Sequence, residues 1–346
     1  MGMIVLRVLA CAVGLAAVVA FFLSIIRVSL LVRHRQDWLA TLVTRVVHGL
    51  FRLGLSGTRA YGPRDHALVY EAPVIVIVLI ATWFVFVIAG FTGIFWAIEA
   101  GSLFRAFVVS GMSLSTLGSV VAETDIGKVT SIAEGGVGLG IVALLITFMP
   151  EFYTVVTQRE HMVSWLAARV GPVPSPTAIV EWLQRTGQLG RDADVWSSWE
   201  TWLSDLDETH SSLTILVYFR SFRPGLSWVT TAGAIVDAAA LVASTVDGPA
   251  GPAVDITLGV GMGALQHIGA AAGVPHASEP VSIDQISVTR AAYDAAFEHL
   301  LAAGVPLKAD RDRAWQDFAG FRARYDRVLL ALTREVEAPQ VPWPPS

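Results

Sequence analysis

The chain has 346 residues, of which 54% are hydrophobic and only 15% are charged. Soluble globular proteins carry about 25% charged residues, so this composition indicates a membrane protein. The net charge of −5 offers no basic surface for nucleic acid. The single cysteine, Cys11, excludes a disulfide framework within the chain and a cysteine-ligated metal site.

The first apolar segment, 8–26, has no charged residue and is close to the roughly 20 residues that cross a bilayer as a helix. A cleaved signal peptide is the alternative, with an apolar core of about 7 to 15 residues and a small-residue cleavage site behind it. Here Arg27, Arg33 and Arg35 follow the segment directly. We therefore expect residues 1–32 to form an uncleaved transmembrane span.

Two further apolar segments predict a second and a third membrane span. Segment 72–98 is uncharged and longer than a span requires. The next segment begins after Glu134 and ends at Pro150, which is short for a span. It is long enough if residues 126–134 add outer turns that lie beside protein rather than lipid, which fits a helix that lines a pore.

The connection between the first two spans sets the orientation. Excess arginine marks a cytoplasmic loop, and arginine far outnumbers aspartate here: Arg27, Arg33, Arg35, Arg45, Arg52, Arg59 and Arg64 stand against Asp37 and Asp65. The amino terminus and segment 99–127 are therefore expected outside the cell. Everything after about residue 155 is expected in the cytoplasm.

This basic linker, 33–68, contains a predicted amphipathic helix at 36–53, in which Trp38 and Leu42 alternate with Arg45 at helical spacing. One interpretation places this helix on the inner leaflet of the membrane. The other is a solvated linker helix.

A polar stretch interrupts the apolar sequence between the second and third spans. Residues 103–114 predict a helix of about three turns, polar residues follow, and Gly118 ends the pattern as a helix stop. A helix that dips into the membrane would turn its carboxyl end, with about half a negative charge, toward a cation. Glu123 and Asp125 would concentrate cations at an outer mouth. An ordinary extracellular hairpin over 102–126 is the alternative.

At this point residues 72–158 resemble the pore-loop potassium-channel superfamily, with its outer helix, re-entrant helix, filter and inner helix. The segment Ser115-Thr116-Leu117-Gly118-Ser119-Val120 aligns with the family filter TVGYG from Thr116 to Val120. The resemblance implies a homotetramer and backbone carbonyls that bind the ion. Ser115, Thr116, Leu117, Gly118 and Ser119 are the filter residues it implies.

The filter departs from the family at Val120, which stands where the last glycine belongs. Stacked carbonyl rings need residues with positive φ, which glycine adopts freely and a β-branched residue resists. We therefore expect a shortened filter with weak discrimination between potassium and sodium.

The start of the inner helix is dense in glycine, at Gly135, Gly136, Gly138 and Gly140. Each glycine lowers helix propensity by about 1 kcal/mol relative to alanine. Close packing behind the filter is one explanation, and a gating hinge at Gly136, Gly138 and Gly140 is the other. Pro150 is expected to kink the helix at its cytoplasmic exit, and Phe148 and Met149 are the predicted hydrophobic constriction.

The remaining sequence, 159–346, predicts an all-α cytoplasmic domain with a stiff proline-rich linker at 171–176 near its start. Trp196, Trp199 and Trp202 lie on one helical face. Segment 213–219 fits a short strand or a helix. Segments 177–187, 256–272, 286–303 and 311–336 predict helices.

Segment 229–246 has one charge, Asp237, and small residues that suit a bundle core, although a further span is the alternative. A set of short strings resembles a bacterial family of two-transmembrane-pore, channel-like membrane proteins with a helical tail: Trp199-Glu200-x-Trp202, Glu208-Thr209-His210, Phe219-Arg220-Ser221 and Ser227-Trp228, with Pro150-x-x-Tyr153 and Arg159-Glu160. Glu208, His210, His267, His276 and His299 lack the spacing of a metal or hydrolytic site.

The sequence thus predicts an all-α membrane protein with a pore domain at 69–158 and a helical cytoplasmic domain. The expected function is a homotetrameric, weakly selective cation channel of the cell (inner) membrane that passes K⁺ or Na⁺. Its partners are lipid, its own copies and these ions, with no cofactor, nucleic acid or enzymatic activity. The alternative is a non-conducting channel-like scaffold whose helical tail binds a partner.

Overall fold

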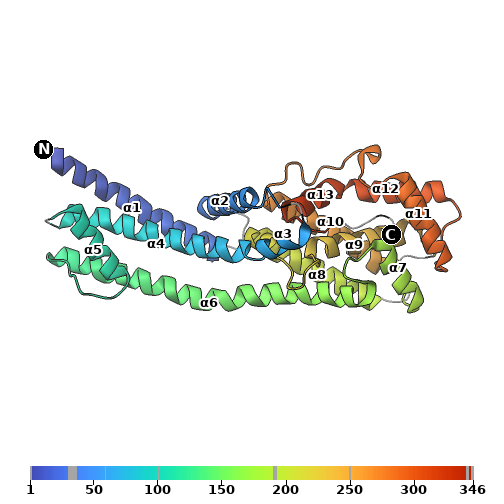
Figure 1. Cartoon of the computed structure of the whole chain (residues 1–346), viewed down its shortest axis with the longest axis horizontal. Coiled ribbons are helices and arrows are strands. Elements are labelled where there is room, and N and C mark those ends of the chain that lie inside the picture. Colours follow the sequence, from blue (N-terminus) through green and yellow to red (C-terminus); the bar gives the residue numbers. More distant parts are fainter. Residues whose placement is uncertain are drawn as a thin grey trace. The chain divides into compact units, whose positions relative to one another are not determined.

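Figure 1 shows the computed structural model of the chain, which describes residues 2–29, 37–58, 60–99, 101–189, 193–248, 251–339 and 343. Throughout these ranges the regular structure is helical, and no strand forms beyond an isolated bridge between Val246 and Leu307. The predicted all-α class is therefore confirmed. The predicted linker residues Arg33, Arg35 and Arg59 lie outside the described residues.

The chain divides into two compact units, each described by itself below. Unit 1 consists of Met1–Gly54 and Pro73–Thr154, and unit 2 consists of Leu55–Ala72 and Val155–Ser346.

Unit 1 contains α1 (Gly2–Ser29), α2 (Trp38–Gly54), most of α4 (Glu71–Ile98), α5 (Leu103–Leu114) and the first part of α6 (Asp125–Val170). Among the described residues, four helices are long and apolar enough to cross a membrane: α1, α4, α6 and α9 (Trp228–Thr245). Three of them, α1, α4 and α6, lie wholly or mostly in unit 1. Length and composition thus support the predicted membrane protein.

Helices α1 and α4 approach each other through small residues. A Cβ atom added to Gly14 would lie 2.3 Å from the carbonyl oxygen of Gly90, and one added to Gly93 would lie 2.5 Å from that of Ala10. Small residues let membrane helices pack with their backbones in contact, where dispersion forces rather than the hydrophobic effect hold them. The glycines therefore fix where these two helices cross.

A series of buried side-chain hydrogen bonds joins α1, α2 and α4 near the carboxyl end of α1. Trp83 Nε1 donates to Ser24 Oγ at 3.0 Å, and Ser24 Oγ donates to Asp37 Oδ2 at 2.7 Å. The same carboxylate oxygen accepts from the amide of Ala40 at 2.9 Å, which caps the first turn of α2. The predicted helix at 36–53 is confirmed as α2, which buries Leu39, Val43 and Val47.

Helix α6 extends well beyond the apolar segment from which it was predicted. The predicted outer turns, 126–134, are helical as expected, and the helix continues past Pro150 to Val170 (Figure 1). The kink expected at Pro150 stays a prediction. Proline removes one backbone hydrogen bond, while the residues on both sides keep theirs. The hydroxyl of Thr154 also donates to the Pro150 carbonyl oxygen at 2.9 Å.

Unit 2 is a helical bundle built around α9. Its other elements are α3 (Tyr61–Leu68), α7 (Pro176–Arg185), α8 (Ala193–Ser212), α10 (Gly251–Ala271), α11 (Arg290–Ala302), α12 (Arg311–Ala323), α13 (Asp326–Glu335) and the short 3-10 helices Thr214–Tyr218 and Ile283–Gln285. Helices α7, α10, α12 and α13 pack on α9, and every residue of α9 except Ala243 is buried. The predicted bundle-core helix is thus confirmed.

Other predictions for this half are met in part. Trp196, Trp199 and Trp202 are all buried on one face of α8, as predicted. The short candidate at 213–219 is a 3-10 helix rather than a strand. The single helix expected over 311–336 is wrong, because the chain breaks before α13 at Tyr325, whose φ is −132°.

A buried ionic cluster explains why α9 tolerates a carboxylate. Asp237 accepts two hydrogen bonds from Arg322 Nη1, at 2.5 and 2.6 Å, and one from the Tyr325 hydroxyl at 2.6 Å. Arg322 Nε donates to Asp326 at 2.7 Å. The break before α13 places Tyr325 within reach of Asp237. The cluster joins α9, α12 and α13 through groups that water does not reach.

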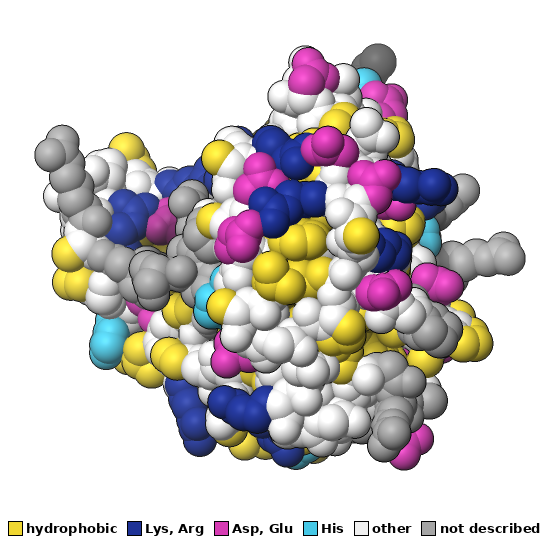
Figure 2. Space-filling model, turned by 90° about the vertical axis from the view of Figure 1, so that its right-hand side faces the viewer, with side chains coloured by type: hydrophobic (Ala, Val, Ile, Leu, Met, Phe, Trp, Pro, Cys, Tyr) yellow, Lys and Arg dark blue, Asp and Glu magenta, His cyan; other side chains and the backbone are white. Residues whose placement is uncertain are grey.

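The surface of unit 2 carries interspersed charges, as Figure 2 shows for one face. Arg290 pairs with Asp312 at 2.7 Å and with Asp294 at 3.0 Å, and all three side chains are more than a third exposed. Near the start of the unit, Arg64 of α3 pairs with Glu337 at 2.5 Å. These contacts hold the surface elements onto the bundle.

Candidate functional site

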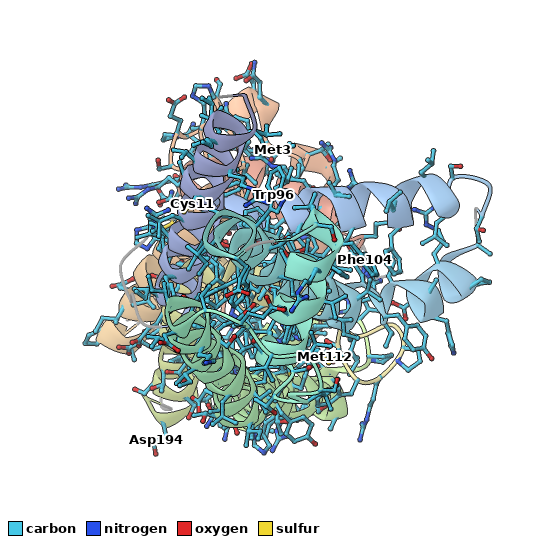
Figure 3. The ribbon with its side chains drawn as sticks, turned by 90° about the vertical axis from the view of Figure 1, so that its left-hand side faces the viewer. Met3, Cys11, Trp96, Phe104, Met112 and Asp194 are labelled. Atoms are coloured by element: carbon cyan, nitrogen blue, oxygen red, sulfur yellow. The ribbon has the colours of Figure 1, made fainter. Side chains whose placement is uncertain are left out.

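The candidate site is α5 with the loop that follows it. Ser102 caps the helix by accepting a hydrogen bond from the Arg105 amide at 3.2 Å, and the helix spans Leu103–Leu114 as predicted. Figure 3 labels Phe104 and Met112 toward its two ends. Twelve residues rise about 18 Å, which is too short to cross a hydrocarbon core of about 30 Å. Helix α5 therefore does not span the bilayer by itself.

The loop after α5 contains two residues with left-handed backbone. Thr116 has a φ of 58° and Gly118 has a φ of 65°. Thr116 stands just past the helix end, where its amide donates to the Ser113 carbonyl oxygen at 3.1 Å. Glycine adopts this conformation freely, but a β-branched threonine resists it, so Thr116 is strained. Strain of this kind is typical of functional loops.

The predicted filter residues form one continuous exposed segment: Ser115, Thr116, Leu117, Gly118 and Ser119. The loop folds back on its helix, since the Ser119 hydroxyl lies 3.1 Å from Met112 Sδ and the Gly118 amide lies 3.4 Å from the Met112 carbonyl oxygen. Val120 has negative φ, as expected for a β-branched residue.

The two predicted acidic residues at the outer mouth each have a basic partner. Glu123 pairs with Arg105, and Asp125 pairs with Lys128 at 3.1 Å. All four side chains are exposed, so solvent weakens both pairs. The role of Glu123 and Asp125 in attracting cations stays a prediction.

A third carboxylate, which the sequence analysis did not single out, anchors the loop exit. Glu99 directly follows α4 and is buried. It accepts hydrogen bonds from the Glu123 amide at 2.9 Å, the Thr124 amide at 3.0 Å and the Thr124 hydroxyl at 2.6 Å. Thr124 in turn caps α6 by accepting from the Gly127 amide at 3.0 Å. One side chain thus ties the end of α4 to the start of α6.

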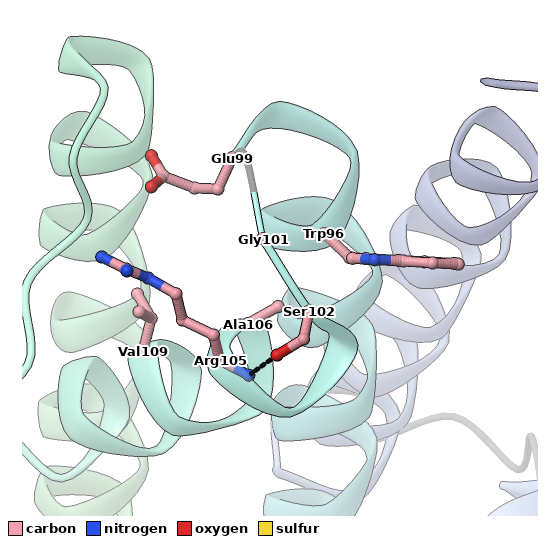
Figure 4. A pocket seen from close by; sticks show the side chains of 7 residues that line it. All are labelled: Trp96, Glu99, Gly101, Ser102, Arg105, Ala106 and Val109. Carbon is pink, nitrogen blue, oxygen red and sulfur yellow. Dashed lines mark hydrogen bonds between the residues drawn. The ribbon is translucent and has the colours of Figure 1, made fainter. Parts of the chain in front are cut away.

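A small recess separates the end of α4 from the start of α5. Its lining consists of Trp96, Glu99, Gly101, Ser102, Arg105, Ala106 and Val109 (Figure 4). Helix α1 closes this region from another side, because Arg7 donates to the carbonyl oxygens of Glu99 and Gly101 at 3.4 and 3.1 Å. The guanidinium of Arg7 also lies 5.8 Å from the Trp96 ring centre. The turn before α5 is therefore held by α1 as well as α4.

The glycines of α6 fall into two groups. A Cβ atom on Gly138 would lie 2.2 Å from the Leu114 carbonyl oxygen, and one on Gly135 would lie 3.2 Å from that of Ser113. Gly136 and Gly140 have open space around them. Close packing behind the predicted filter therefore explains Gly135 and Gly138. A hinge at Gly136 or Gly140 stays a prediction.

The predicted constriction lies further along α6. Phe148 is half-buried, whereas Met149 and Pro150 are exposed. Within this single chain the three residues do not enclose a path, so the constriction also stays a prediction.

A second carboxylate missed by the sequence analysis lies behind α5. Glu134 of α6 is fully buried, and its Oε1 is 2.5 Å from the Ser110 hydroxyl oxygen. That hydroxyl is also 3.2 Å from the Ile88 carbonyl oxygen of α4. A lone acidic residue between apolar segments of a membrane helix is a signal of function that could have identified it.

The histidines named as a weak alternative site do not meet. His210 is buried beside Arg159, while His267, His276 and His299 contact Asp207, Glu279 and Glu181 respectively. Among the described residues, no three His, Cys, Asp or Glu side chains gather as a metal site. Burial, and then the charge of Arg159, hold the pKa of His210 well below its usual value, so this ring is neutral.

The Glu99 anchor leads to a pH-dependent prediction. Burial raises the pKa of Glu99, but hydrogen bonds from Thr124 and the Glu123 amide outweigh burial and lower it. The stabilisation is therefore complete above the unfolded pKa of about 4.3 and is lost as pH falls through the lower folded pKa. Glu99→Gln should destabilise unit 1 by about 2 kcal/mol at neutral pH. Thermal unfolding should show this difference shrinking in acid.

The matched control is Glu123→Gln, which changes an exposed carboxylate that pairs with Arg105. It should shift stability by less than about 1 kcal/mol at either pH. A Glu99→Gln difference that stays constant into strong acid would show that the anchor does not depend on the charge.

Comparison of the chain with models of protein families, with curated proteins and with solved structures returned no match.

Proposed function

We propose that several copies of this chain, four by resemblance, surround a cation pathway that is lined by residues 115–119. The observation that carries the proposal is a short helix, placed between two apolar membrane helices, that ends in an exposed polar loop. Backbone of this kind is tolerated at membrane depth only beside protein or water. A shared aqueous axis meets that need.

The outward face of α6 fits the assembly. Large apolar side chains recur on it three or four residues apart, with Gly136 in the one longer gap: Ile126, Val129, Ile132, Leu139, Val142, Ile146, Met149 and Tyr153 are all exposed. On the opposite face Glu134, Gly138 and Ile141 are turned away from solvent or against α5, since Glu134 and Ile141 are buried and Gly138 lies against the Leu114 carbonyl. In the proposed assembly, part of the exposed face lines the path or meets the neighbouring copy, and lipid covers the rest.

The loop chemistry favours a cation. The carboxyl end of α5 carries a partial negative charge from its aligned peptide dipoles. The carbonyl groups and the Thr116 hydroxyl offer oxygen ligands next to it. With positive φ confined to Thr116 and Gly118 in this loop, and Val120 unable to add a further carbonyl ring, few dehydrating sites form. The proposed channel therefore discriminates weakly between potassium and sodium.

The proposed orientation follows from the arginines of the linker, which favour the cytoplasm. In this orientation the protein lies in the cell (inner) membrane, and unit 2 is a cytoplasmic bundle that supports or gates the pore.

Flux tests the proposal. Liposomes that hold the purified protein should leak potassium and sodium at similar rates, and Gly118→Asp should reduce the leak at least tenfold. Aspartate at this position disfavours the left-handed backbone that glycine adopts freely, and it places a side chain beside the path where glycine has none. Ion-selective electrodes or rubidium uptake measure the leak.

A matched control is Gly187→Asp in unit 2, where φ is 69° and the surroundings are open, as at Gly118. This variant should leak like the unmodified protein. Absence of any leak from the unmodified protein would instead favour the non-conducting scaffold. A strong preference for potassium would contradict the shortened filter.

A further inference from the structure

The buried carboxyl group of Glu134 has an unusual hydrogen-bond environment. Its Oε1 lies 2.5 Å from Ser110 Oγ, whereas its Oε2 is buried and has no hydrogen-bond partner among the described residues. Glu134 is 0% exposed. An ionised carboxylate normally accepts several hydrogen bonds, so the site provides little support for a negative charge.

The number of hydrogens at Ser110 shows which protonation state of Glu134 allows hydrogen bonds among the Glu134 carboxyl, the Ser110 hydroxyl and the Ile88 carbonyl together. The hydroxyl has one hydrogen but two oxygen neighbours, Glu134 Oε1 at 2.5 Å and the Ile88 carbonyl oxygen at 3.2 Å. If Glu134 is ionised, the hydroxyl must choose between them. If Glu134 is protonated, it donates to Ser110, and Ser110 donates to Ile88, so both contacts become hydrogen bonds.

The charged groups on the neighbouring helices do not compensate a carboxylate here. Helix α4 has no charged residue between its first residue, Glu71, and its end. Helix α5 has one, Arg105, which pairs with Glu123. On α6 itself the nearest charges in sequence are Lys128, which pairs with Asp125, and Glu151. The charges of α1 are Arg7, which binds the turn before α5, and Arg27 at its other end.

We propose that Glu134 is a proton-binding site, whose protonated form links α6, α5 and α4 through the chain Glu134–Ser110–Ile88. Loss of the proton breaks one of the two hydrogen bonds and leaves an uncompensated charge behind α5. Helix α5, which leads into residues 115–119, then loses one of the hydrogen bonds that link it to α4 and α6. The consequence for conduction rests on the proposed function, whereas the proton site itself does not.

Infrared spectroscopy of the full-length protein in lipid tests the site directly. A protonated carboxylic acid has a carbonyl stretching band that an ionised carboxylate lacks. At neutral pH this band should be present in the unmodified protein and lost in Glu134→Gln. Glu151→Gln, which changes an exposed glutamate on the same helix, should keep it. Absence of the band at neutral pH, or its survival in Glu134→Gln, would overturn the proposal.

A pH profile separates the proton site from a merely structural role. Glutamine can donate to Ser110 as the protonated acid does, so the Glu134→Gln protein should still fold. Its unfolding temperature should vary less with pH than that of the unmodified protein. The unmodified protein should lose thermal stability steadily as pH rises from the acidic range, where an unfolded glutamate ionises, to the pH at which Glu134 loses its proton in the folded protein, with Glu151→Gln following it. If Glu134→Gln showed the same pH profile as the unmodified protein, the proposed proton-binding site would be refuted.

Liposome flux then distinguishes the two proposals. A band that depends on Glu134 in a protein that does not leak supports the proton site and contradicts the channel. A leak that is independent of pH, together with no band, supports the channel and contradicts the proton site.

Discussion

Replacing Arg322 by methionine is expected to destabilise unit 2 by about 3–5 kcal/mol, because it leaves Asp237 and Asp326 buried without their shared cation. Burial lowers the pKa of Arg322, but the charge of Asp237 outweighs burial and raises it, so the guanidinium stays charged. Burial, reinforced by Asp237, holds the pKa of Tyr325 well above its usual value, so its hydroxyl remains a donor.

The measurement is thermal unfolding of the full chain in detergent or lipid nanodiscs. A loss of this size corresponds to a fall in Tm of roughly 10 °C for a bundle of 150–250 residues. Arg290→Met is the matched control, since its pairs with Asp294 and Asp312 are exposed and contribute less than about 1 kcal/mol. Equal shifts for the two variants would mean that the buried cluster has no special role in the bundle.

A second large effect is expected from one added methyl group. Gly138→Ala places a Cβ atom 2.2 Å from the Leu114 carbonyl oxygen, and a backbone atom cannot move aside as a flexible side chain can. Overpacking costs about 1–3 kcal/mol, and we expect the upper end here. Because the contact lies where α5 ends, the change should also displace residues 115–119 and reduce the proposed leak.

Gly136→Ala provides the control for stability. It lies on the same helix, nothing stands within 4 Å of its added Cβ, and alanine favours the helix by about 1 kcal/mol. Thermal unfolding should therefore move in opposite directions for the two variants. A Gly138→Ala protein as stable as the Gly136→Ala protein would show that α6 and α5 do not pack as described.

Helix α5 could be predicted to the residue, because its signals are local. Ser102 is a capping residue, apolar positions recur at helical spacing, and polar residues follow Leu114. The close packing of Gly138 was also among the sequence interpretations. Its partner, the Leu114 carbonyl, could not be predicted from the sequence. Every residue has a backbone carbonyl, so a contact with glycine does not require a particular residue type.

The two buried glutamates were missed for a shared reason. In the sequence, Glu99 follows one apolar segment and Glu134 was interpreted only as the start of another, where a charge ordinarily faces water. Their partners, Thr124 and Ser110, lie 25 and 24 residues away along the chain and carry no charge. Hydrogen bonds between an acid and a hydroxyl have no spacing rule, so only the packed structure reveals them.

A longer-range contact explains the break between α12 and α13. The break at Tyr325 brings its hydroxyl to Asp237, which lies 88 residues earlier. Local propensity favoured one continuous helix, and a buried carboxylate on another helix outweighed it.

The hydrogen bonds of Arg7 with Glu99 and Gly101 place the beginning of α1 beside the turn before α5. In the proposed membrane arrangement, these two segments therefore face the same side of the bilayer, and the orientation of α1 fixes the side from which α5 enters.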